Sequence, residues 1–124
     1  MIMNEKKKLV VLITHGLDSE KASVAWSIAN GGIKSGLDVS IFLTSSAIDW
    51  VRKGAADKVH LNPFDPPMKD MIEFVRTSGC TIMVCPPCAD VRGYTKDDLL
   101  DGVVITGSGA MHKLIEQGAA VISI

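Results

Sequence analysis

The sequence predicts an α/β fold with five mostly parallel strands and helices on both faces of the sheet. Five short apolar runs are separated by segments with helical periodicity, and none of these runs alternates cleanly between apolar and polar residues. Continuous apolar strands are typical of a parallel sheet that is covered on both sides. At 124 residues and 47% hydrophobic, the chain has the size and core of one domain spanning residues 1–124.

The predicted strands are the apolar runs themselves. The first is rich in Leu, Val and Ile, which favour buried strands. In chain order the five runs are residues 9–13, 39–43, 81–84, 103–105 and 120–122.

The first predicted helix lies between residues 18 and 35. Asp18 and Ser19 suit its N-terminal cap, and Gly36 suits the left-handed position after its last turn. Gly31 and Gly32 lie inside it, and each costs about 1 kcal/mol relative to alanine, which favours an early break. Its core-facing stripe comprises Ala22, Ala25, Trp26, Ala29 and Ile33.

A second apolar stripe on this helix indicates an oligomer. Val24 and Ile28, together with Trp26, give the helix more apolar surface than one core face uses. We therefore expect another copy of the chain to bury it.

The next two helices are predicted on either side of an irregular segment, residues 54–67. A short helix spans residues 45–53. Asp65 caps the following one, with Pro66 at the first helical position, where its missing N–H does no harm. The buried face of that helix comprises Met68, Met71, Ile72 and Val75.

The C-terminal third contains two further helical segments. Residues 95–98, Thr-Lys-Asp-Asp, resemble a capping box that opens a short turn. Ser108 caps the last helix and Gly118 ends it.

Charge and hydropathy exclude several classes of function. With 13 basic and 14 acidic residues, the chain lacks the basic excess of nucleic-acid-binding or membrane-surface proteins. No apolar run approaches the roughly 18 residues that a membrane span needs, and residues 9–13 are too few for a signal-peptide core. We therefore expect a cytoplasmic protein, in which cysteines are more often catalytic, metal-binding or inert than disulfide-bonded.

The strongest chemical signal is Cys85-Pro86-Pro87-Cys88, at the end of the third strand. Two cysteines at this spacing suit thiol chemistry or metal binding. A residue before a proline avoids the α region, which favours an extended path of about 9 Å between the cysteines. A disulfide needs Cα atoms within about 6.8 Å. This bias is not absolute, and we expect Cys85 to be the exposed nucleophile and Cys88, in the first helical turn, to be secondary.

Other polar residues also follow predicted strands, where ligands bind in parallel α/β sheets. Several of the segments that follow the predicted strands lead into helix N-termini, which favour anions such as a thiolate or persulfide. For Ser45 and Ser46 a purely capping role is equally consistent with the sequence, and Ser108 is best interpreted as a cap. The residues that we expect to bind substrate are His15, Thr44, Ser45 and Ser46.

No metal or cofactor is expected. Cys80 stands at the opposite end of the third strand, roughly 16 Å from Cys85, so it can share neither a disulfide nor a metal with it. A structural zinc site needs four ligands, and His60 and His112 lack ligand spacing.

The segment CPPCADVRG, residues 85–93, resembles the DsrE/DsrF-like family of sulfur-relay proteins. That family carries a cysteine at the end of a central strand, followed eight residues later by the glycine of an Arg-Gly step. Residues 101–103, Asp-Gly-Val, and 39–44, Val-Ser-Ile-Phe-Leu-Thr, also fit. The resemblance covers residues 9–124 and implies a three-layer α/β/α sandwich that assembles as a homotrimer or hexamer.

The resemblance also implies a function. In the relay members the cysteine that matches Cys85 accepts sulfane sulfur as a persulfide and passes it to a partner thiol. This chain would then be a persulfide carrier with sulfurtransferase-like chemistry, and its partners would be a sulfur donor and an acceptor thiol protein. The prolines between Cys85 and Cys88 depart from the family pattern. Two alternatives therefore stay open, a thiol–disulfide redox protein that uses both cysteines and a non-catalytic subunit of an oligomer.

Overall fold

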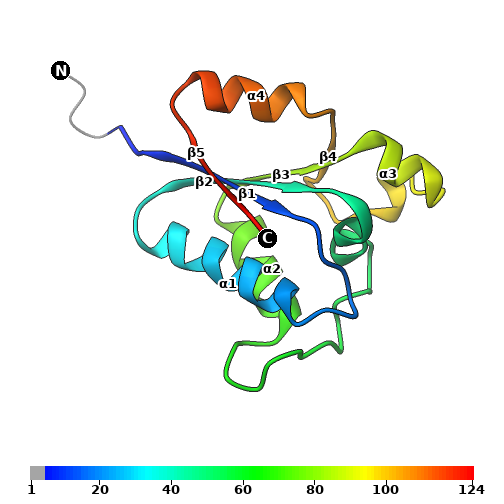
Figure 1. Ribbon diagram of the computed structural model, residues 1–124. Helices are drawn as coiled ribbons and strands as arrows, with labels where there is room; N and C mark the ends of the chain where they lie inside the picture. Colours follow the sequence, from blue (N-terminus) through cyan, green and yellow to red (C-terminus); the bar gives the residue numbers. More distant parts are fainter. Residues whose placement is uncertain (1–4) are drawn as a thin grey trace.

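Five parallel strands form one sheet, in the order β4-β3-β2-β1-β5 (Figure 1). The structure is a computed structural model that describes residues 5–124. Every pair of neighbouring strands is parallel, as the continuous apolar runs predicted. The strands are β1 Lys8–Ile13, β2 Asp38–Leu43, β3 Thr81–Val84, β4 Val104–Ile105 and β5 Ala120–Ser123.

Helices cover both faces of the sheet. On one face α1, Lys21–Lys34, packs beside α2, Met68–Thr77, whereas α4, Gly109–Glu116, covers the other (Figure 1). The short helix α3, Pro86–Val91, lies beyond the carboxyl end of β3. The predicted α/β/α sandwich is thus confirmed.

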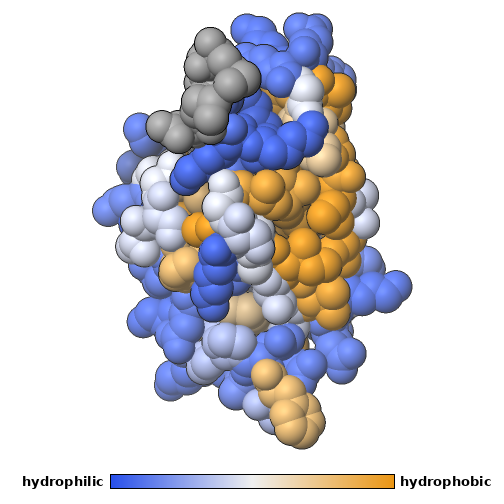
Figure 2. Space-filling model, turned by 90° about the vertical axis from the view of Figure 1, so that its left-hand side faces the viewer, coloured by the Kyte–Doolittle hydropathy of each residue, from blue (hydrophilic) through white to orange (hydrophobic). Residues whose placement is uncertain are grey.

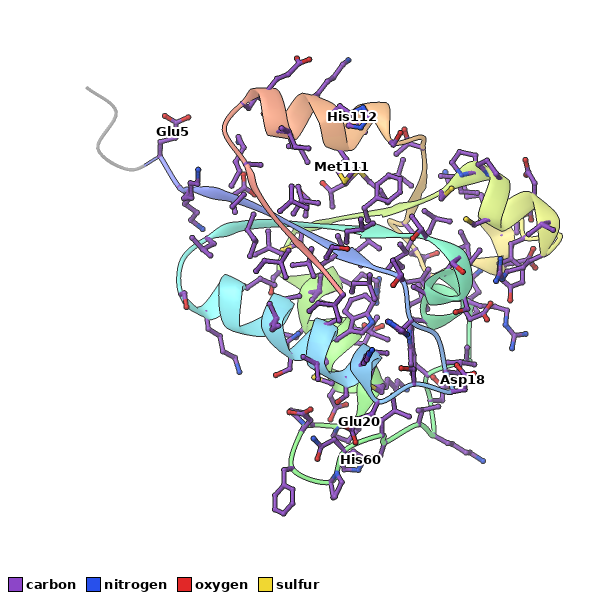
Figure 3. The ribbon with its side chains drawn as sticks, in the orientation of Figure 1. Glu5, Asp18, Glu20, His60, Met111 and His112 are labelled. Carbon is purple, nitrogen blue, oxygen red and sulfur yellow. The ribbon has the colours of Figure 1, made fainter. Side chains whose placement is uncertain are left out.

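Two apolar clusters form the core, one on each face of the sheet. The larger lies on the side of α1 and α2 and contains Trp26 and Trp50, both fully buried. On the other face, Met111 of α4 packs on a smaller cluster, and Figure 3 shows its side chain directed toward the sheet. The buried members of the smaller cluster are Val10, Phe42 and Met83.

Helix α1 differs from the prediction at its start and in its middle. It begins at Lys21 with Glu20 as the N-cap, and no side chain caps it. It also continues through Gly31 and Gly32 to Lys34 instead of breaking early. The reason lies in packing, since a Cβ on Gly32 would come within 3.1 Å of Val39 Cγ2. Glycine therefore lets the helix lie close to the sheet, and this contact offsets its poor helix propensity.

The segment from β2 to α2 also corrects two predictions. The short helix predicted for residues 45–53 is present as a 3₁₀ helix, η1, but it ends at Val51, so that it spans Ser45–Val51. Helix α2 begins at Met68 with Pro67 as its N-cap, so Asp65 does not cap it. Asp65 instead accepts a 2.7 Å hydrogen bond from the hydroxyl of Ser23 on α1. The predicted buried face of α2 is confirmed in full.

The remaining short elements follow the sequence signals closely. The predicted capping box is present, with Asp98 bonded to both the backbone and the side chain of Thr95 at the start of η2, Lys96–Asp98. Gly118 has a φ of 93° after α4, as a left-handed terminal position requires. Ser108 is the N-cap residue of α4, but its side chain makes no capping hydrogen bond.

Part of the exposed apolar surface lies on the β5 side of the molecule, where Figure 2 shows a broad apolar area. Val121 and Ile122 on the unpaired edge of β5 are 41% and 37% exposed, and Ile115 on α4 is 44% exposed. The predicted α1 surface is smaller, because Trp26 is buried in the chain's own core and Val24 alone is largely exposed there. Within residues 5–124, no helix is long and apolar enough to cross a membrane.

Candidate functional site: two thiols at the carboxyl ends of β2 and β3

The candidate site is built where β3 passes into α3. The backbone N–H of Cys85 donates to Leu43 O over 3.1 Å, which continues the pairing of β3 with β2 by one residue. Cys85 is then the N-cap residue of α3, with an extended backbone. Cys88 follows at the third helical position. The Cys85 side chain makes no capping hydrogen bond, and the Cys88 thiol lies close enough to raise the pKa of Cys85.

The extended path that the prolines favour is not adopted, whereas the expected place of Cys88 in the first helical turn is confirmed. Cys85 does take the extended conformation that a following proline favours. Pro86 and Pro87, however, occupy the first two helical positions, and Ala89 N–H closes the turn on Cys85 O over 3.1 Å. Proline is tolerated there because the first backbone N–H groups of a helix have no intrahelical acceptor. The two prolines therefore start a helix and place both cysteines at its first turn.

Cys85 is half-buried and not freely exposed as expected. Its side chain packs on the cluster beneath α4. Burial raises the pKa of the Cys85 thiol, and the nearby Cys88 thiol also raises it, whereas the Cys88 backbone N–H lowers it. The pKa therefore moves upward, against the depression expected from a neighbouring helix N-terminus. A raised pKa keeps the free thiol protonated at neutral pH.

Cys88 has a different environment. Its side chain packs against the larger core cluster, and its sulfur accepts a 3.1 Å hydrogen bond from the backbone N–H of Ser45. Ser45 opens η1 directly after β2 with a φ of 53°, the left-handed region that a non-glycine residue rarely adopts. Ser45 therefore contacts the site through its backbone, which sequence reasoning had not anticipated. Its side chain was predicted to bind substrate, and that role stays a prediction.

A polar cluster joins η1 to α3 behind this contact. Asp49 of η1 accepts a 2.6 Å hydrogen bond from the hydroxyl of Tyr94, and its Oδ1 lies 3.7 Å from Arg92 Nε. Arg92 also donates to Cys88 O over 3.2 Å. Hydrogen bonding to Asp49, with burial, raises the pKa of Tyr94. Sequence analysis missed Asp49 and Tyr94, because they lie 45 residues apart and neither stands at a strand end.

The loop after β1 borders the other side of η1. Gly16 lies so close to it that a Cβ there would be 2.7 Å from Ser46 O. Trp50 Nε1 donates to His15 O over 2.9 Å, so it is the backbone of His15 that anchors this loop to η1. Strand β1 lies two strands from β3, a separation of about 10 Å. The structure thus places His15, Thr44 and Ser46 at the same carboxyl edge of the sheet as the two thiols. The thiol that accepts a hydrogen bond from η1 is that of Cys88 and not that of Cys85.

The remaining candidate groups lie apart from this pair. Cys80 precedes β3 at its opposite end, as predicted, and it is half-buried there with a pKa raised chiefly by burial. Figure 3 shows His112 on α4 and His60 in the loop between η1 and α2. His60 hydrogen-bonds Asp65 O over 2.7 Å. No three His, Cys, Asp or Glu side chains among residues 5–124 converge as metal ligands.

Fold and site together define a cysteine-bearing α/β protein with a thiol pair beyond the carboxyl ends of a parallel sheet. The model of the DsrE/DsrF-like family matches residues 7–124, and the chain belongs to that family. The resemblance noted from residues 85–93 is thereby confirmed.

Relatives and solved structures extend the comparison. An uncharacterised protein of Methanocaldococcus jannaschii, MJ0989, is 30% identical over 114 residues, which are 87% of this chain and 89% of that protein. A second from the same organism, MJ0760, is 29% identical over 82% of this chain, which spans only 37% of that relative's length. The crystal structure of the ychN protein from E. coli has a TM-score of 0.76 at 21% identity and covers 97% of this chain and all of that one. At this identity the structural likeness shows the fold.

Proposed function

We propose that this protein is a cytoplasmic sulfur carrier in which Cys85 accepts sulfane sulfur and passes it to a thiol of a partner protein. The supporting observation is the position of Cys85 at the carboxyl end of β3, in a chain of the DsrE/DsrF-like family. A thiol at this place opens onto the edge where parallel α/β sheets bind ligands.

The transfer consists of two thiol exchanges. Cys85 first loses its proton to solvent, and the thiolate attacks the outer sulfur of a donor persulfide, so that a Cys85 persulfide forms and the donor leaves as a thiolate. An acceptor thiolate then attacks the outer sulfur of the Cys85 persulfide and regenerates the Cys85 thiolate. No net oxidation occurs, because one sulfur–sulfur bond breaks as another forms in each exchange.

The expected assembly is a homotrimer or hexamer. The exposed apolar residues Val121 and Ile122 on the unpaired edge of β5 support burial of this edge by another copy of the chain. Isolated parallel edge strands with apolar side chains are liabilities that proteins normally cover.

Mass spectrometry after incubation with polysulfide tests the carrier function. The protein should gain the mass of one sulfur atom, located on the peptide that contains Cys85. Cys85→Ser should abolish the gain, whereas the matched variant Cys80→Ser should retain it. Equal loading of the Cys85→Ser protein would remove Cys85 from the mechanism.

A thiol–disulfide redox function is the second candidate. The N-cap and third helical positions of Cys85 and Cys88 favour it, because this spacing directs one thiol toward the other. A redox protein would cycle between dithiol and disulfide with an added dithiol partner, and it would do so without any sulfane sulfur.

A further inference from the structure

We propose that Cys88 is a second catalytic thiol, which attacks the Cys85 persulfide and releases its outer sulfur as hydrosulfide. The product is a Cys85–Cys88 disulfide. This inference rests on the proposed loading of Cys85, and it specifies what happens to the sulfur when no acceptor protein takes it.

The two prolines leave the Cys85 sulfur poorly stabilised as an anion. A side chain at an N-cap position normally accepts hydrogen bonds from the N–H groups of the second and third helical residues. Pro87 occupies the second position and has no N–H, which leaves Cys88 N–H as the remaining donor. The Cys85 side chain is also half-buried against the smaller apolar cluster.

Cys88 instead receives a donor from η1, the 3₁₀ helix that follows β2. The Ser45 N–H points at its sulfur across 3.1 Å, and the backbone holds this donor in place at a φ of 53°. An N–H directed at a sulfur stabilises the negative charge that a nucleophile carries. Polar contacts from Asp49 to Tyr94 and Arg92 join η1 to the segment after Cys88. These contacts hold the Ser45 N–H and the Cys88 sulfur in position relative to each other.

The reaction is balanced within the chain. Cys88 loses its proton to solvent, and the thiolate attacks Cys85 Sγ, the inner sulfur of the persulfide. A bond forms between the two cysteine sulfurs, the bond to the outer sulfur breaks, and hydrosulfide leaves with the electron pair. The sulfane sulfur is thus reduced and the two cysteines are oxidised. A low-molecular-weight thiol or a dithiol protein restores the cysteines for the next turnover.

Single-turnover release of hydrosulfide tests the proposal. The full chain is loaded with polysulfide, desalted, and held without oxygen or added thiol while hydrosulfide and intact mass are followed. The wild-type protein should release one hydrosulfide per loaded chain and end two hydrogens lighter than the reduced protein. Cys88→Ala and Cys88→Ser should retain the persulfide and release at least about tenfold more slowly, since they lose the neighbouring nucleophile. Cys80→Ala should behave as wild type.

Each other outcome contradicts the proposal. Equal release from wild type and both Cys88 variants would exclude an attack by Cys88, and so would recovery of the sulfur on Cys88. If wild-type Cys85 loads and serves an added acceptor thiol but forms no disulfide, the inference fails and the carrier function stands. If Cys85 never loads, both fail.

Discussion

The backbone N–H of Ser45 and the sulfur of Cys88 lie 3.1 Å apart and form a hydrogen bond between residues 43 positions apart in the chain. The contact joins the end of β2 to the first turn after β3, which are neighbouring strands. Its geometry depends on a left-handed backbone at Ser45. A strained conformation at such a position persists only where surrounding structure holds it.

Replacing Ser45 with glycine should stabilise the protein and leave Cys88 unaffected. The N–H that contacts Cys88 is retained, while the left-handed conformation, which costs a non-glycine residue roughly 1 kcal/mol, becomes free of strain. Urea unfolding should show a gain of up to about 1 kcal/mol, less the added entropy of the unfolded chain. Ser45→Val should instead lose stability. A loss for Ser45→Gly would mean that the side chain, and not the N–H, holds this turn.

Replacing Pro87 with alanine should lower the pKa of Cys85. The change adds an N–H at the second helical position, where it can donate to the sulfur of the N-cap residue. A hydrogen bond to a charged group is worth enough to raise the thiolate fraction at neutral pH on the order of tenfold. The rate of iodoacetamide labelling of Cys85 at neutral pH measures this thiolate fraction. Pro86→Ala is the matched control, because the first helical position does not donate to the cap, and equal acceleration in both variants would contradict the argument.

The single tyrosine of the chain should titrate above its ordinary range. The carboxylate of Asp49 accepts a hydrogen bond from the Tyr94 hydroxyl and opposes a second negative charge, which raises the pKa of Tyr94. Ultraviolet absorbance of tyrosinate should therefore rise at higher pH than in a denatured sample, and Asp49→Asn should move the midpoint down. Because the folded pKa is the higher one, the stability from this contact is present below the ordinary pKa and is lost as pH rises through the folded pKa.

Gly16→Ala should destabilise the protein by about 1–3 kcal/mol, the usual cost of overpacking. The added Cβ would lie 2.7 Å from Ser46 O, a backbone atom that cannot rotate away. Gly107→Ala is the control, because a Cβ there meets nothing within 4 Å. Thermal unfolding of the two variants should separate them clearly, and similar melting temperatures would show that the loop after β1 is not packed on η1.

Val121→Glu should reduce the size of the assembly. A buried charge at the edge of β5 would remain unpaired and would cost several kcal/mol at an interface. Sedimentation should show a trimer or hexamer for the wild-type protein and a smaller species for the variant. Phe64→Glu is the matched control, since Phe64 is 97% exposed in a loop away from β5. A monomeric wild-type protein would contradict the proposed assembly outright.

The sequence by itself determined the sheet and the place of the thiols. The buried strands read as continuous apolar runs because both faces of a parallel sheet are covered, and β3 was located to the residue, with Cys85 directly after it. The buried face of α2 followed from helical periodicity in the same way. These features can be predicted from a short segment, because buried positions recur at a fixed spacing along a strand or a helix and are occupied by apolar residues.

Only the tertiary structure decided how the thiols differ. The prolines favour an extended path from Cys85 to Cys88, but hydrogen bonds of the first helical turn overcame that preference and set Cys88 in the helix, as expected. The packing of Cys85 on the smaller cluster and the approach of Ser45 to Cys88 join residues far apart in the chain. A pKa depends on such neighbours and on burial, and no single segment encodes either.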